Sequence, residues 1–272
     1  LLLEQERYEE SYRAATDALK RFPTGANAPT LMLVSARALF FAEKYGGAAE
    51  AFSRFIAENP GSPEASSAYF QLGMCGEILG DYKAASRAFR TLAARFSADS
   101  LVPEALYRAG ESLYNNSQFE QALEVYLDVV ARFPASEQAQ KALYSASWTY
   151  MDMEQEQASI ESMERLVASY PKSGYARYAQ FSIGDYYYSK KEYEKALAAY
   201  QKVTTLFPDT QEAGKAVSLL ADLEEDLASL EYDRVFAHFD QGNYAVAVRG
   251  FESIYESFPE SYSALAALAN KG

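Results

Sequence analysis

The chain has 272 residues, of which 49% are hydrophobic, enough apolar material for a continuous core; a largely disordered chain is excluded. Its net charge is −13 and its longest basic runs are pairs such as Lys190-Lys191, so nucleic acid and anionic lipid are poor partners. The single cysteine, Cys75, excludes an intrachain disulfide, and no segment approaches the roughly 18 apolar residues of a membrane span.

Helix-breaking pairs recur along the chain at a constant interval of 37 residues. These pairs are Phe22-Pro23, Asn59-Pro60, Phe96-Ser97, Phe133-Pro134, Tyr170-Pro171 and Phe207-Pro208. A constant period of this length is typical of helical hairpins that stack into a solenoid. The next pair, Phe258-Pro259, follows after 51 residues, so the last repeat contains 14 additional residues.

Three columns of residues keep the same register and predict two antiparallel helices per repeat. The first column is small: Ala36, Gly73, Gly110, Ser147, Gly184 and Ala221. The second, 12 positions later, is also small: Ala48, Ala85, Ala122, Ser159 and Ala196. The third, four positions further, is large: Phe52, Phe89, Tyr126, Met163 and Tyr200. Small residues let two helix backbones approach, and the large side chain fills the adjoining gap.

Polar residues two positions after the breaks are suited to cap the first helices. They are Ser62, Asp99, Ser136, Ser173 and Thr210. Their side-chain oxygens can accept hydrogen bonds from the backbone N–H groups that lack a partner at a helix start. Pro63 is expected at the first helical position, where its missing N–H costs nothing. The second helices are expected to begin at aromatic residues: Tyr45, Tyr82, Phe119 and Tyr193.

These signals place the helices in chain order. A helix is expected from Tyr8, and helix pairs follow at 28–42/45–58, 63–79/82–96, 100–115/119–132, 137–153/156–169 and 174–190/193–206. The next helix should run from about Thr210 to Phe239, because its 14 additional residues add about four turns. Its partner is expected near 244–257, with a truncated helix after it. We therefore expect an all-α solenoid over 1–272, of about six to seven helix-pair repeats, partial at both ends and with a helical extension in 210–243.

The pattern of small, small and large residues followed by Pro resembles the tetratricopeptide repeat (TPR) family over nearly the whole chain. The third and fifth repeats match it best, with Gly110, Ala122, Tyr126 and Pro134, and with Gly184, Ala196, Tyr200 and Pro208. The fourth repeat departs from it, with Ser147, Glu156, Ser159 and Met163. The period is 37 rather than the usual 34, which is similar to bacterial envelope proteins such as BamD and YbgF.

The resemblance implies a right-handed superhelix and a non-catalytic scaffold that binds proteins, placed in the periplasm or at the outer membrane and taking part in envelope assembly. A cytoplasmic location is the alternative. Two other functions stay open: a self-assembling structural module, and the TPR segment of a larger multidomain protein. Because the chain starts and stops inside a repeat, we expect it to be a piece of a longer protein.

The resemblance also implies that the first helices line a concave groove, and aromatic residues recur there. One column is aromatic at the interval of 37: Phe70, Tyr107, Tyr144 and Phe181. The following turns add Trp148, Tyr114, Met151 and Tyr188, with acidic residues such as Glu111 beside them. Such a column suits an extended peptide or a partner helix, since Trp and Tyr are frequent at binding hot spots. The alternative is that these rings are core residues packed between adjacent hairpins.

Residues for chemistry are scarce. His238 is the only histidine, which argues against most metal sites and against Ser-His or Cys-His catalysis. Cys75 is expected to be a small buried hydrophobe, and Glu224-Glu225-Asp226 a solvated helix face. The glycines do not form a phosphate-binding loop. We expect no enzyme activity, no cofactor and no metal.

Overall fold

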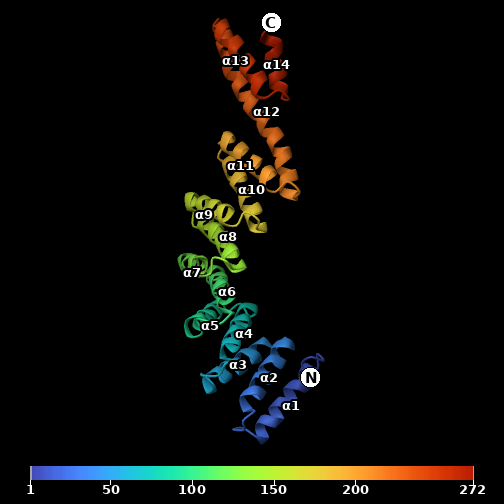
Figure 1. Ribbon diagram of the computed structural model, residues 1–272, viewed down its shortest axis with the longest axis vertical. Coiled ribbons are helices and arrows are strands. Elements are labelled where there is room, and N and C mark those ends of the chain that lie inside the picture. The colour runs from blue at the N-terminus through green and yellow to red at the C-terminus, as the bar shows by residue number, and fades with distance from the viewer. Residues whose placement is uncertain (1, 272) are drawn as a thin grey trace. The chain divides into compact units, whose positions relative to one another are not determined.

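The computed structural model describes residues 2–271, and all regular structure in that range is α-helical (Figure 1). The first seven helices are α1 (Tyr8–Arg21), α2 (Ala28–Phe41), α3 (Tyr45–Glu58), α4 (Ala65–Ile78), α5 (Tyr82–Arg95), α6 (Val102–Asn115) and α7 (Phe119–Arg132). The others are α8 (Glu137–Asp152), α9 (Glu156–Ser169), α10 (Gly174–Ser189), α11 (Tyr193–Leu206), α12 (Gln211–Asp240), α13 (Tyr244–Ser257) and α14 (Tyr262–Lys271).

The chain divides into two compact units, Leu1–Ser162 and Met163–Gly272. In unit 1, helices α1 to α7 each contact the next helix in the chain, and α6 also contacts α8. In unit 2, the long helix α12 contacts α10, α11, α13 and α14. The expected all-α solenoid of stacked antiparallel helix pairs is confirmed, and the helices begin and end within two residues of the predicted positions.

The columns of small and large residues make the contacts expected within the hairpins. The rings of Phe89, Tyr126 and Tyr200 are buried. A Cβ atom added at Gly73, Gly110 or Gly184 would lie 2.5 Å from the corresponding ring. Since carbon atoms in contact normally lie about 3.5–4.0 Å apart, only glycine allows these rings to pack so closely on the first helix.

The small column does not continue into α12 as predicted. Ala221 is exposed, whereas Ala216 and Leu223 are buried with the residues of α11. The additional residues explain the difference, because the second half of α12 packs on α13. In this hairpin the large residue, Val235, lies on the first helix, α12, and the glycine, Gly250, lies on the second helix, α13. A Cβ atom added at Gly250 would be 2.5 Å from Val235 Cγ2.

Three of the five predicted caps hold helix starts. The oxygens of Ser136, Ser173 and Thr210 accept hydrogen bonds from the backbone N–H groups of Ala139, Tyr175 and Ala213 at 3.1, 3.2 and 3.2 Å.

Ser62 and Asp99 are not the N-cap residues, and Pro63 is not the first helical residue, so these positions were predicted wrongly. The side-chain oxygens still accept backbone hydrogen bonds as expected, Ser62 Oγ from Glu64 N–H at 3.3 Å and Asp99 Oδ1 from Leu101 N–H at 2.9 Å. The helices after them begin at Ala65 and Val102, because the intervening residues form a turn in which Ala65 N–H donates to Ser62 O at 3.0 Å and Val102 N–H to Asp99 O at 3.1 Å.

The turn inside each hairpin contains one residue with a left-handed backbone. The positions follow the repeat, with φ between 56° and 80°: Glu6, Glu43, Gly80, Ser117, Glu154, Lys191 and Gly242. The following residue closes the helix end, as when Asp81 N–H donates to Gly76 O at 2.8 Å, which is the hydrogen bond of a Schellman motif. Only two of the seven are glycine, so five turns carry a side chain in a backbone conformation that disfavours one.

Candidate functional site

The predicted aromatic column in unit 1 lies on α4, α6 and α8. We call the surface formed by Phe70, Tyr107, Tyr144 and Trp148 the first-helix face. Phe70 and Tyr107 are half-buried, and their rings pack against the large core residues of the same hairpins, with centroid distances of 5.5 Å to Phe89 and 6.1 Å to Tyr126. Each ring therefore contributes one side to the core and leaves part of its surface accessible.

Trp148 is the most accessible ring on this face, with 41% of its surface exposed. It stands edge-on to Tyr144, one turn earlier on α8, with a centroid distance of 6.1 Å. Such T-shaped pairs are favourable beyond their buried area because the positive edge of one ring meets the negative face of the other. The contact holds the indole in one orientation while leaving its outer surface open to solvent.

The other two predicted residues of unit 1, Tyr114 and Met151, are half-buried. The Tyr114 ring lies 5.4 Å from that of Phe119, and its hydroxyl donates a hydrogen bond to the Asp152 carboxylate. This bond, assisted by burial, raises the pKa of Tyr114 to about 12. The bond also ties α6 to α8 at one end of the first-helix face.

A charged network lies beside the aromatic column. The guanidinium of Arg108 lies over the Phe70 ring, 5.9 Å from its centroid. It forms ion pairs of 2.8 Å with both Glu77 and Glu104, and Gln138 Nε2 donates to Glu104 at 3.1 Å.

Burial and charge act in opposite directions within this network. Burial alone would lower the pKa of Arg108, but the carboxylates of Glu77 and Glu104 outweigh it and raise that pKa. Burial raises the pKa of Glu77 by more than Arg108 lowers it. The sequence reasoning missed Arg108 and Glu104, although their spacing of four residues beside Tyr107 is the signal of a helical ion pair.

Two acidic residues expected to flank the groove are engaged by core tyrosines. Tyr126 donates its hydroxyl hydrogen bond to Glu111, and Tyr200 donates to Asp185 at 2.6 Å. Burial, together with the adjacent carboxylate, raises the pKa of both tyrosines. Each carboxylate follows directly after the column glycine, so the motif combines close helix packing with one partly buried hydrogen bond.

In unit 2, Phe181 and Tyr188 lie on α10. Phe181 packs on Tyr200 with a centroid distance of 5.4 Å, as Phe70 packs on Phe89 in unit 1. Tyr188 is 39% exposed and its ring lies 5.8 Å from that of Tyr193. The same division therefore holds here, with one ring half in the core and another directed to solvent.

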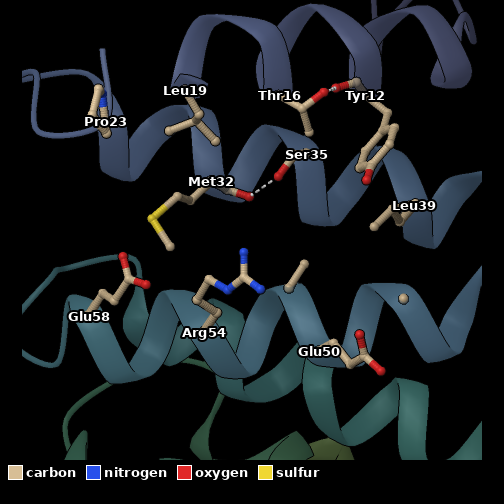
Figure 2. A pocket seen from close by; sticks show the side chains of 12 residues that line it. Tyr12, Thr16, Leu19, Pro23, Met32, Ser35, Leu39, Glu50, Arg54 and Glu58 are labelled. Carbon is tan, nitrogen blue, oxygen red and sulfur yellow. Dashed lines mark hydrogen bonds between the residues drawn. The ribbon is translucent and has the colours of Figure 1, made fainter. Parts of the chain in front are cut away.

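A separate pocket of about 420 Å³ lies between α1, α2 and α3. Figure 2 shows Leu19 and Tyr12 of α1 pointing toward it, and Arg54 and Glu58 of α3 pointing into the space below Met32. Its lining mixes apolar side chains with charges of both signs, so it selects no particular partner.

Within residues 2–271, no helix combines the length and the apolar character needed to cross a membrane. In the same range, no three His, Cys, Asp or Glu side chains are grouped to hold a metal ion. Cys75 is buried, and burial raises its thiol pKa to about 11, so the reactive thiolate is scarce at neutral pH.

Two family models match the chain. A tetratricopeptide repeat model matches residues 1–63 and 33–85, and the model YfiO, an outer membrane lipoprotein, matches residues 99–271, which is more than half of the chain. The chain belongs to the YfiO family. The expected resemblance to TPR proteins and to envelope lipoproteins is thereby confirmed. No curated protein matches the chain.

Solved structures share the fold at low sequence identity. A TPR protein from Parabacteroides merdae has a TM-score of 0.52 and 15% identity, covering 89% of this chain and 97% of its own. YrrB, described as a TPR protein with an unusual peptide-binding site, has a TM-score of 0.51 and 19% identity, covering 76% and 100%. MamA has a TM-score of 0.50 and 18% identity, covering 63% and 93%. At these identities the structures establish the fold, and the fold and family together support a protein-interaction scaffold.

Proposed function

We propose that the protein is a non-catalytic scaffold of the bacterial cell envelope, and that the first-helix face of unit 1 binds an extended segment or a helix of a partner protein. The observation that carries this proposal is the exposed ring of Trp148, held edge-on by Tyr144 on a face where aromatic side chains recur with the repeat. A fixed and exposed Trp offers a large contact area at little further cost in conformational entropy.

The polar surroundings of the column favour a specific partner over general adhesion. Arg108 is fixed by two carboxylates and lies over Phe70, so the donors and acceptors at this edge are already oriented. Preoriented groups lose less entropy on binding than mobile ones. The description of YrrB as a peptide-binding TPR protein supports a peptide or protein ligand, and we expect no metal, no cofactor and no nucleic acid.

The envelope assignment rests on membership in a family described as outer membrane lipoproteins. It implies a protein in the periplasm or at the inner surface of the outer membrane that takes part in envelope assembly. Fractionating cells that produce the full-length protein tests this: recovery with periplasmic or outer-membrane markers is expected, and recovery with cytoplasmic markers would establish the alternative location.

Self-assembly is the second candidate, favoured by the exposed apolar residues of α14. Tyr262 is 83% exposed, and Leu265 and Leu268 are also exposed on this helix. Light scattering over a range of concentrations separates the two functions. A scaffold that binds another protein keeps a constant mass, whereas a self-assembling module gains mass with concentration.

The binding face is tested by photo-crosslinking in cells. A photoreactive amino acid replaces Trp148, and the control probe replaces Ala131, which is exposed on α7 of the same unit. We expect one partner to be captured from position 148 and not from 131, and its peptides to identify it. Equal capture from both positions, or from neither, would contradict the assignment of this face.

A further inference from the structure

A second groove in unit 1 lies on the side of the second helices, between α5 and α7. Its volume is about 520 Å³. Lys83, Arg87 and Arg90 of α5 line it, Gln118 and Gln121 lie opposite, and Leu113 of α6 is part of the lining. We call it the basic groove. It is separate from the first-helix face, which lies on α4, α6 and α8.

The three cations form one stripe along α5. Their spacing of four and three residues places them on the same side of the helix, and all three are exposed. Within the described range 2–271, none of their side chains has an ion-pair or hydrogen-bond partner. Arg108 and Arg132 of the same unit, by contrast, each pair with a carboxylate. These three cations therefore form a local positive charge on a chain whose net charge is −13.

We propose that the basic groove binds an acidic, extended segment of a partner protein. Lys83 and Arg87 are separated by about 6 Å along the helix, at 1.5 Å per residue. Alternate residues of an extended chain are about 6.7 Å apart and point to the same side. Two carboxylates at alternate positions of an extended peptide therefore match Lys83 and Arg87, and Arg90, about 4.5 Å further along the helix, adds a third positive charge. The side-chain amides of Gln118 and Gln121 can hydrogen-bond the peptide backbone.

Other anionic occupants fit the groove less well. An anionic membrane surface is wide, so the net charge of −13 of the whole chain would repel it. A narrow acidic segment would instead interact mainly with the cations of the groove. A second copy of this chain would have to offer an available acidic run. Its Glu224-Glu225-Asp226 run is partly engaged, because the Glu225 carboxylate accepts hydrogen bonds from the backbone N–H groups of Tyr262 and Ser263 at 2.7 and 3.2 Å.

The test measures fluorescence anisotropy of a labelled peptide of alternating Asp and Ser, titrated with the whole chain. We expect binding that weakens as salt rises, because the cations are exposed and screened. The double variant Arg87→Glu/Arg90→Glu should bind about tenfold more weakly or not at all. Lys202→Glu, an exposed position on α11, carries the same kind of charge reversal away from the groove and should bind as the wild type does. Circular dichroism confirms that each variant is folded.

Four outcomes would overturn the proposal. The first is equal binding by the double variant and the wild type. The second is equal binding of a peptide of alternating Lys and Ser. The third is sedimentation of the chain with phosphatidylglycerol vesicles that the acidic peptide does not reverse, which would make the occupant a membrane. The fourth is a mass that rises with concentration and that the double variant abolishes, which would make it a second copy. Trp148→Ala should leave binding of the acidic peptide unchanged, because Trp148 lies on the first-helix face and not in the basic groove. A negative result for the basic groove can therefore be distinguished from a negative result for the first-helix face.

Discussion

Replacing Gly110 by Ala tests whether close approach of the two helices determines the register of each hairpin. The new Cβ atom would lie 2.5 Å from Cε1, 2.7 Å from Cδ1 and 3.1 Å from Cζ of Tyr126. Contact requires about 3.5 Å, so the ring must move by about 1 Å. Tyr126 is fully buried and its hydroxyl is bonded to Glu111, so the movement disturbs both packing and the hydrogen bond.

The magnitude follows from two opposing effects. Overpacking of this severity costs about 3 kcal/mol, the upper end of the usual range. Alanine recovers about 1 kcal/mol through its higher helix propensity. The net loss of about 2 kcal/mol should lower the melting temperature by roughly 4–8 °C.

Thermal unfolding followed by circular dichroism measures the effect, with Gly46→Ala as the matched control. Gly46 lies in α3 of the same unit and has no neighbouring atom within 4 Å of the added Cβ, so its replacement should not destabilise and should raise the melting temperature slightly. If Gly110→Ala melts at or above the wild-type temperature, the steric explanation of the small column is wrong.

Three further predictions concern unit 1. The folded state raises the pKa of Tyr126 above its ordinary value of about 10, so the stability that this shift contributes is present below that pH and is lost as pH rises above it. In urea titrations, Tyr126→Phe should therefore lose less stability than the wild type between about pH 9 and 11, and an equal loss would refute the buried phenol. Ser117→Gly should stabilise by up to about 1 kcal/mol in chemical denaturation, because glycine adopts its φ of 57° without strain, and a destabilised variant would contradict this. Arg108→Gln leaves the half-buried Glu77 without its cation and should lower the free energy of unfolding by about 1 kcal/mol after solvent screening. Adding Glu77→Gln to that variant should restore part of the lost stability, and strictly additive losses would show that the two residues are not coupled.

Most of the fold could be predicted from the sequence because the contacts that define a hairpin repeat with the period. Gly110, Ala122 and Tyr126 belong to one hairpin, so their spacing reports directly on helix packing. The left-handed turn residues were harder to recognise, because only Gly80 and Gly242 have the residue type that such a backbone favours.

The surfaces could be predicted less well. The residues of the aromatic column were visible, but their division between core and surface depends on ring orientation, which places Phe70 against Phe89 and leaves Trp148 exposed. The basic groove was missed because its cations are not contiguous in sequence. Lys83, Arg87 and Arg90 form a cluster only once the helix brings them to one side.

The most direct test of the first-helix face is the affinity of the crosslinked partner for two purified variants of the chain. Trp148→Ala removes the exposed ring of the face, and Phe22→Ala removes an aromatic ring elsewhere in unit 1 that is even more exposed, at 65% against 41%. We expect Trp148→Ala to weaken binding by about 2 kcal/mol, roughly thirtyfold, at unchanged helical content, and Phe22→Ala to bind as the wild type does. Unchanged affinity in Trp148→Ala, or an equal loss in both variants, would contradict a binding role for this face.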